Sequence, residues 1–324
     1  MITWGVVANS HDASIAVANV GASDTKVLWA GLAKDFSGVP NDPHLNSGLI
    51  DKAKSFGEPS SIIWYERPML KTARQWLAGQ GILLKENNIR RYLKEYDLEH
   101  PIKYIQHHNC HAAYAYYTQP YDECAVICLD SIGEFETLTI WQGKDNKLKK
   151  LHSQRYPHSL GLFYSAMTQR LGLVPQRDEY LVSQWASKGD PHRYSEMLFD
   201  EIIQTEGMGS NPFIRMRENL HRGCMWWRPE IASEQELYDL AAAVQWAFEY
   251  CVCNLGAWVK RTTGCENLAL AGGGAMNRDA VNLLRRQFKT VWVPPNPGDP
   301  GSCVGAVLAK HKQRINYIDK VWNR

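Results

Sequence analysis

The sequence predicts an α/β protein of two lobes, because one order of elements, three strands followed by alternating helices and strands, occurs twice along it. Short apolar runs with strand periodicity open each half, at residues 3–33 and 124–154. Helical patterns then alternate with short buried-strand runs in both halves. The chain has 324 residues, of which 44% are hydrophobic and 22% charged, so it is long enough to bury two such cores.

The periodicities place the individual elements. The first half contains strands at 3–9, 14–20 and 26–33, a helical stretch, a strand at 61–65, a helix at 85–98, a strand at 102–106 and a helix from 107. The second half contains strands at 124–130, 137–141 and 148–154, helices at 161–173 and 234–261, a strand at 267–272, a helix at 277–288, a strand at 290–295 and a helix at 301–313.

This repeated order is typical of the actin-like (ASKHA) architecture, in which duplicated βββαβα lobes enclose a central cleft. We expect a first lobe at residues 1–120 and a second lobe at 121–324 that ends with the C-terminal helix. An unrelated α/β fold with an open sheet is the alternative.

Composition and charge exclude several classes of protein. A net charge of +2 gives no argument for nucleic acid binding, and no apolar run approaches the roughly 20 residues of a membrane span. The start, MITWGVVANSHD, lacks the regions of a signal peptide. The eight cysteines are too sparse for a disulfide scaffold and lack zinc-ligand spacing. We therefore expect a cytoplasmic protein without a membrane partner.

Three histidines lie within HHNCHAAYAYY, residues 107–117. On a helix His107 and His111 share one face, whereas His108 points elsewhere. Neutral imidazoles on one face suit a transition metal such as zinc, iron, manganese or nickel. An ordinary pair of core or surface histidines is the alternative, and carboxylates from other segments are needed before the pair indicates a metal site.

Two strand-to-strand turns carry polar residues where this fold tends to bind phosphate. The turn in ANSHDASIA places His11 and Asp12 at a strand end. The turn in LDSIGEFETLTI places Asp130, Ser131, Gly133 and Glu134 there. An aspartate at such a point is either a turn former or a site residue. Asp130 is a natural third ligand, because the histidine helix leads directly into its strand.

Two further turns precede helices. In LALAGGGAMN, residues 268–277, three glycines allow exposed amides to approach a phosphate or an adenosine, although a plain tight turn is equally compatible. The segment is neither a dinucleotide fingerprint nor a Walker A loop. Asp299 in PPNPGDPGSCVGAVLA either caps the following helix or reaches across the cleft as a fourth ligand.

Together these segments resemble one family. The motifs HDASIA, HHNCHAAYAYY, LDSIGE, PHSLGLFYSAMTQRLGL, LAGGGAMN and GDPGSCVGAVLA follow the order found in O-carbamoyltransferases, the nodulation and antibiotic-tailoring enzymes related to the tRNA threonylcarbamoyl transferases. The resemblance covers about residues 5–310. It implies transfer of a carbamoyl group from carbamoyl phosphate, through ATP and carbamoyl-adenylate, to a hydroxyl acceptor.

The resemblance also assigns residues. It implies a divalent metal, most often iron with manganese, zinc and magnesium as alternatives, held by His107, His111, Asp130 and Asp299. Asp12 would act as the base, with His11 positioning the acceptor or sharing that task. The adenylate would lie along the residues of the two glycine-containing turns, namely Ser131, Gly133, Glu134, Gly272, Gly273, Gly274 and Asn277.

The sequence departs from the family in ways that bear on donor and acceptor. Longer members carry a further C-terminal domain that forms carbamoyl-adenylate, so we expect a separate donor-forming protein or a more direct use of carbamoyl phosphate. Similar short members occur in phage-like genomes, which makes a hydroxymethylated nucleobase in DNA a candidate acceptor beside a small molecule. Trp226 and Trp227 would line an acceptor pocket or pack the lobes together.

Two other functions remain as hypotheses at this point. A sugar or metabolite kinase of the same fold would transfer phosphate and would not need the histidine pair. A nucleotide-binding protein without turnover would have no physical reason to keep four metal-liganding side chains together.

Overall fold

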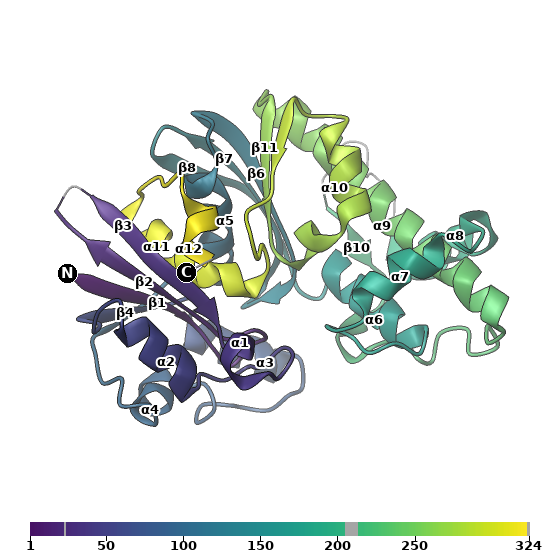
Figure 1. The fold of residues 1–324 in the computed structure, drawn as a ribbon. Coiled ribbons are helices and arrows are strands. Elements are labelled where there is room, and N and C mark those ends of the chain that lie inside the picture. The colour runs from purple at the N-terminus through teal and green to yellow at the C-terminus, as the bar shows by residue number, and fades with distance from the viewer. Residues whose placement is uncertain (23, 205–212, 323–324) are drawn as a thin grey trace.

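Two five-stranded sheets form the framework of the computed structural model, which describes residues 1–22, 24–204 and 213–322 (Figure 1). The first sheet has the order β3-β2-β1-β4-β5 and the second the equivalent order β8-β7-β6-β11-β12. In each sheet three consecutive antiparallel strands are extended by two parallel strands. The predicted duplication and the actin-like fold are therefore confirmed.

The strands of the first sheet are β1 (Ile2–Val7), β2 (Ser14–Val20), β3 (Thr25–Leu32), β4 (Ser61–Trp64) and β5 (Ile102–Tyr104). Those of the second are β6 (Glu123–Gly133), β7 (Glu136–Lys144), β8 (Lys147–Arg155), β11 (Asn267–Ala271) and β12 (Thr290–Trp292). A two-stranded ribbon, β9 (Ile203–Gln204) and β10 (Arg215–Met216), belongs to an insertion after β8.

The helices of the first half are α1 (Lys34–Ser37), α2 (Ser47–Lys54), α3 (Pro68–Leu77), α4 (Ile89–Lys94) and α5 (His107–Thr118). Those of the second half are α6 (Leu160–Arg170), α7 (Glu179–Ala186), α8 (Ser195–Glu201), α9 (Glu234–Thr263), α10 (Arg278–Arg285), α11 (Ser302–His311) and α12 (Ile318–Trp322). Short 3-10 turns include η2 (Leu220–Arg222), η3 (Gly273–Met276) and η4 (Asp299–Gly301). In the part of the chain that the structure describes, no helix combines the length and apolar character needed to cross a bilayer.

The second sheet divides the apolar core, because alternate residues of a strand face opposite sides. Cys124, Val126 and Cys128 of β6 pack with the first sheet, α5 and α11. Their neighbours Ala125 and Ile127 pack with α6, α9 and α10 on the other side. The layer of α5 and α11 therefore lies between the two sheets (Figure 1).

Glycine allows the central helices to approach closely. A Cβ at Gly305 of α11 would lie 2.1 Å from the carbonyl oxygen of Cys110 in α5. A Cβ at Gly5 of β1 would lie 1.9 Å from the carbonyl oxygen of Cys303 in α11. These contacts fix α11 against both α5 and the first sheet, and α12 packs on β3. The proposed lobe boundary near residue 120 stays a prediction.

Two local differences from the predicted elements have clear causes. The helix expected at 85–98 is shorter, since the side chain of Asn88 accepts a hydrogen bond from the amide of Arg91 and starts α4 there. Helix α3 is not among the predicted elements. It begins with Pro68, a residue suited to the first helical position, and ends before a loop with two glycines.

Candidate metal centre

Helix α5 carries two candidate ligands on one face. The Nε2 atoms of His107 and His111 lie 2.9 Å apart, and both residues are almost fully buried. Strand β6 passes close to this face at Gly133, where a Cβ would lie 2.2 Å from Cδ2 of His107. Only glycine fits at this position of the strand, because a side chain would collide with the imidazole.

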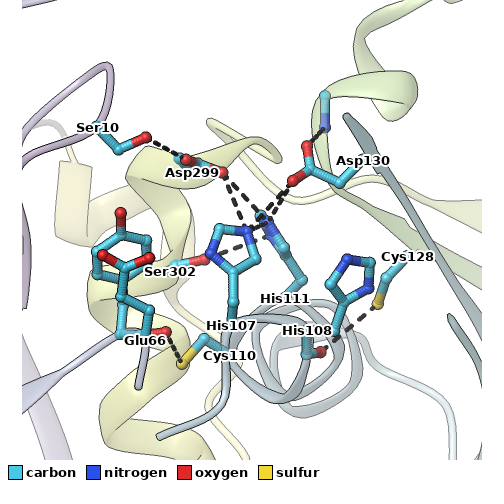
Figure 2. A network of polar contacts seen from close by, with 12 residues as sticks. Ser10, Glu66, His107, His108, Cys110, His111, Cys128, Asp130, Asp299 and Ser302 are labelled. Carbon is cyan, nitrogen blue, oxygen red and sulfur yellow. Dashed lines mark hydrogen bonds and ion pairs between the residues drawn. The ribbon is translucent and has the colours of Figure 1, made fainter. Parts of the chain in front are cut away.

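Two aspartates from distant segments approach these imidazoles. Asp130 lies in β6, where the pairing with β7 shifts register, and Asp299 opens η4 directly before α11. Nε2 of His107 is 3.3 Å from Oδ2 of Asp130 and 3.3 Å from Oδ1 of Asp299. Nε2 of His111 is 3.4 Å from the same oxygen of Asp299. Figure 2 shows both carboxylates directed at the two rings.

The donor set fits a divalent transition metal. One ligand atom from each of His107, His111, Asp130 and Asp299 lies within 4.8 Å of the others. Ligands about 2.1 Å from one ion lie roughly 3–3.5 Å from each other, which matches most of the separations in this cluster. Two imidazole nitrogens and two carboxylate oxygens suit iron, manganese or zinc better than calcium.

The histidines and aspartates of the cluster are buried together, and each shifts the pKa values of its neighbours. Burial lowers the pKa of His107, but Asp299 and Asp130 outweigh it and hold that pKa well above its usual value. Burial and Asp299 raise the pKa of Asp130, yet the two histidines bring it to about 2. The pKa of Asp299 likewise lies well below its usual range because of the histidines. Both carboxylates are therefore ionised at neutral pH.

Three of the four residues have outer hydrogen-bond partners that orient them. Ser10 donates to Oδ2 of Asp299 at 2.7 Å, and the amide of Gly273 donates to Oδ1 of Asp130 at 3.2 Å. Oγ of Ser302 lies 3.4 Å from Nδ1 of His111. Such partners fix ring and carboxylate orientation at metal sites. Nδ1 of His107 is buried and has no partner among the residues that the structure describes.

The first turn lies beside this cluster. Ser10, which contacts Asp299, directly precedes His11 and Asp12. Oδ2 of Asp12 accepts a hydrogen bond from Nζ of Lys34 at 3.0 Å, whereas its Oδ1 is buried without a partner. His11 is partly exposed. The turn that carries Asp12 is thus joined to the candidate metal centre through the hydrogen bond from Ser10 to Asp299.

The glycine turn after β11 contacts the cluster directly. Gly272 has φ 87°, a conformation that favours glycine, and a Cβ there would lie 2.3 Å from the carbonyl oxygen of Leu129. The amide of Gly273 points at Asp130, and Gly274 packs on Leu129. Ser131 is half-buried one residue after Asp130. The amide of Gly272 donates to the carbonyl of Pro297 at 2.7 Å, so the turn uses the amides of Gly272 and Gly273 to hold its own shape and Asp130.

Two residues assigned to the nucleotide are otherwise engaged. The side chain of Asn277 caps α10 through the amide of Ala280 and pairs with Gln245. One oxygen of Glu134 accepts a hydrogen bond from the amide of Arg67 at the start of α3, and the other is buried without a partner. Neither side chain makes a hydrogen bond to the four-residue cluster in the described structure.

Several residues of the site were not predicted. They are small or common polar residues: Ser10, Ser302 and Lys34. The sequence signal for a site role is limited to their positions, next to His11, shortly after Asp299 and after the end of a strand, respectively. The tryptophan pair takes two separate roles: Trp227 is buried and donates to Glu201, and Trp226 is exposed.

Comparisons with known proteins bear on the family of this chain. An uncharacterized protein of Synechocystis, sll1178, is 29% identical over 96% of this chain and 57% of its own length. The nodulation protein NolO of Bradyrhizobium diazoefficiens is 30% identical over 63% of this chain and 38% of its own length. The chain therefore spans about half the length of these relatives or less.

A solved structure confirms the fold alone. Full-length HypF in its phosphate- and nucleotide-bound form aligns with 96% of this chain and 55% of its own, at 13% identity and a TM-score of 0.51. The family model described as Carbamoyltransferase N-terminus matches residues 64–308, which include α5, β6, the glycine turn and η4. The chain belongs to the carbamoyltransferase family, in the part that this N-terminal model describes.

Proposed function

We propose that this chain is the transfer domain of a metal-dependent O-carbamoyltransferase. The observation that carries the proposal is the convergence of two imidazoles and two carboxylates, from α5, β6 and η4, beside the turn that carries Asp12. Membership of the carbamoyltransferase family supplies the reaction class. A kinase of the same fold has no need of the histidine pair.

His107, His111, Asp130 and Asp299 would hold a divalent cation, for which we favour iron, with manganese, zinc or magnesium as alternatives. When bound, such a cation supplies Lewis-acid stabilisation of negative charge on a carbonyl or phosphate oxygen. Ser10, Ser302 and the amide of Gly273 keep the ligands in their orientations.

Asp12 is the proposed base. In carbamoyl transfer the hydroxyl oxygen of the acceptor attacks the carbamoyl carbon, the bond from that carbon to the phosphate oxygen breaks, and the hydroxyl proton must leave. Oδ1 of Asp12, buried and without a partner among the described residues, would accept this proton, while Lys34 holds Oδ2. His11, adjacent and partly exposed, would position the acceptor.

The donor is proposed to be carbamoyl-adenylate or carbamoyl phosphate. Gly272, Gly273 and Gly274, with Ser131 and Gly133, would line the phosphate of this donor. The amides of Gly272 and Gly273 already donate to Pro297 and Asp130, so phosphate oxygens would meet the amide of Gly274 and the hydroxyl of Ser131. HypF, which shares the fold, was solved with phosphate and nucleotide bound, and this supports a nucleotide-containing donor. ATP would be used to form the adenylate, by a separate protein or a further domain. Glu134 and Asn277 would then act indirectly, by shaping the turns.

The acceptor is an alcohol, either a small molecule or a hydroxymethylated nucleobase in DNA. Incubation of the purified chain and its Mn²⁺- or Fe²⁺-loaded form with carbamoyl phosphate, ATP and alcohols of both kinds tests the proposal. Mass spectrometry should show one added carbamoyl group on an alcohol, and carbamoyl-adenylate prepared separately bypasses any missing activation step. The variant Asp12→Asn should lose the product but keep the bound metal.

Two results would contradict the proposal. A phosphorylated product that persists in His107→Ala would indicate a kinase. Absence of carbamoyl transfer from ready-made carbamoyl-adenylate across sugars, nucleosides and hydroxymethylated DNA would leave a nucleotide-binding protein without turnover.

A further inference from the structure

Arg74 of α3 is a buried arginine without a counter-ion. Its side chain belongs to a residue that is only 7% exposed, and it forms no ion pair with any residue that the structure describes. Burial lowers the pKa of Arg74 although the charge of Glu66 opposes this, and Glu66 is itself paired with Lys71 at 2.7 Å. Buried charges in proteins are normally paired or fully hydrogen-bonded, because an isolated one is costly. A counter-ion from outside the chain would meet this requirement.

Most of the hydrogen-bonding capacity of Arg74 is also unused. A guanidinium has five N–H donors and no acceptor. Among the described residues its one hydrogen bond runs from Nη1 to Oε1 of Gln80, at 3.0 Å. Nε is buried and has no partner there. Nε and Nη2 form one edge of the guanidinium, so this whole edge is free to hold an acceptor.

Gln80 connects Arg74 to His221 of η2, in the insertion after β8. Because its oxygen accepts from Arg74, its amide nitrogen faces Nε2 of His221, at 3.1 Å. An amide nitrogen only donates, so Nε2 of the imidazole accepts and a neutral ring carries its proton on Nδ1. Burial, Arg74 and Arg222 all lower the pKa of His221, which keeps the ring neutral at pH 7. Nδ1 is then another buried donor, and it has no partner among the described residues.

Arg222 adds a second positive charge at this junction. Its Nη2 donates to the carbonyls of Ala78 and Gly79, directly after α3, at 3.4 and 3.2 Å. The side chain is exposed and makes no ion pair within the described ranges. Helix α3 and η2 therefore bring together three side chains with unused donors, and two of them are cations.

We propose that Arg74, His221 and Arg222 form an anion site between α3 and η2, and that its ligand carries a phosphate group. Unused donors call for a ligand that supplies acceptors, which excludes an ammonium group. Two arginines favour a dianion, and the free edge of Arg74 fits two oxygens of one phosphate. Inorganic phosphate and a phosphate ester share this chemistry. The metal cluster and the glycine turn contribute none of these residues, so the site does not depend on the proposed function.

Phosphate binding can be measured on the metal-free chain without any turnover. Calorimetric titration with sodium phosphate should show binding, and phosphate should raise the melting temperature above that in sodium chloride of equal ionic strength. Arg74→Gln should weaken phosphate binding by more than about tenfold, because it removes the paired charge-assisted hydrogen bonds. Arg222→Gln changes an exposed residue that folding does not require, and it should weaken binding about three- to tenfold.

Arg285→Gln is the matched control, since Arg285 is an exposed arginine of α10 that contacts Asn282 and neither α3 nor η2. It should leave phosphate affinity unchanged. Equal phosphate affinity in wild type, Arg74→Gln and Arg222→Gln would overturn the proposal, even if phosphate binds elsewhere on the chain. A wild-type protein that phosphate stabilises no more than chloride does would overturn it as well.

Glucose 6-phosphate and glucose identify the source of the phosphate group. An ester that binds more tightly than inorganic phosphate, with loss of affinity in Arg222→Gln, would indicate a phosphorylated ligand. The reverse order would indicate free phosphate. Glucose that binds as tightly as its 6-phosphate would contradict recognition through phosphate.

Discussion

At the scale of single residues, the carboxylates of Asp130 and Asp299 determine the protonation state of His107. Its Nε2 lies 3.3 Å from an oxygen of Asp130 and 3.3 Å from an oxygen of Asp299. These partners outweigh burial and keep the pKa of His107 well above 6.5 in the metal-free protein. A metal ligand must be deprotonated, so the cation has to displace this proton.

A pH dependence of metal binding follows. We expect release of about one proton per Mn²⁺ bound near pH 7, and an affinity that rises about tenfold per pH unit below the pKa of His107. Calorimetry in buffers of different ionisation enthalpy measures the released protons. Heats that do not depend on the buffer would show that His107 is already neutral or is not a ligand.

Removal of a ligand gives a direct test of the cluster. Loss of a residue that only hydrogen-bonds a metal ligand lowers metal affinity roughly 10–100-fold. His107→Ala removes a ligand itself and should lower the affinity by more than that. His108→Gln is the matched control, because His108 sits on the same helix and pairs with Thr139 rather than with the aspartates. Metal content after dialysis against a chelator, measured by mass spectrometry, distinguishes them. Equal metal content in the two variants would disprove the ligand assignment.

At the scale of elements, Glu134 joins the strand β6 to the start of α3. Its Oε1 accepts the amide hydrogen of Arg67, a favourable place for a carboxylate at a helix N-terminus. Burial nevertheless raises the pKa of Glu134 to about 7, although this hydrogen bond lowers it. Because the folded pKa exceeds that of the unfolded chain, the carboxyl contributes stability at low pH that is lost as the pH rises towards 7.

Glu134→Gln should remove this loss. We compare the metal-free variant with the metal-free wild type. The difference in their free energies of unfolding should shift by about 1–3 kcal/mol in favour of the variant from pH 5 to pH 8. Urea unfolding at both pH values measures it, with Glu58→Gln, an exposed carboxylate, as the control. A difference that stays constant with pH would mean that Glu134 titrates normally.

Helix α3 shows the limit of what sequence periodicity predicts. Strong periodicity predicted the strands of both sheets and the helix that holds His107 and His111. Helix α3 has no comparable signal, because its exposed face carries Met69, Trp76 and Leu77 and its buried positions include Thr72 and Arg74. The buried polar residues of α3 are paired outside the helix: Thr72 accepts a hydrogen bond from Asn87, and Arg74 donates one to Gln80. This inverted polarity depends on tertiary contacts that periodicity does not encode.

At the scale of the whole molecule, the site exists only because two lobes bring separate segments together. The family resemblance assigned His107, His111, Asp130 and Asp299 as ligands. The residues alone left Asp130 as either a turn former or a site residue, and Asp299 as either a helix cap or a fourth ligand. Their convergence depends on the packing of α11 against α5, which no local pattern encodes. Ser10 and Ser302 escaped prediction for the same reason, since each acts through a partner almost 200 residues away or more.

The contact between α11 and α5 is therefore where metal binding and stability should be coupled. A Cβ at Gly305 would lie 2.1 Å from the backbone oxygen of Cys110, so Gly305→Ala must push the helices apart. We expect it to lower the free energy of unfolding by about 1–3 kcal/mol despite the better helix propensity of alanine. It should also weaken metal binding, because α5 carries both histidines and Asp299 directly precedes α11.

Gly298→Ala provides the comparison, since its nearest neighbour would be 3.8 Å away and its φ of −74° suits any residue. It should change the free energy of unfolding by no more than about 0.5 kcal/mol. Denaturant unfolding and Mn²⁺ titration of both variants give the two quantities. If Gly305→Ala loses stability but binds metal as wild type does, the four ligands are held in place by contacts other than the packing of α11 against α5. The two-lobe packing would then not be what positions the cation.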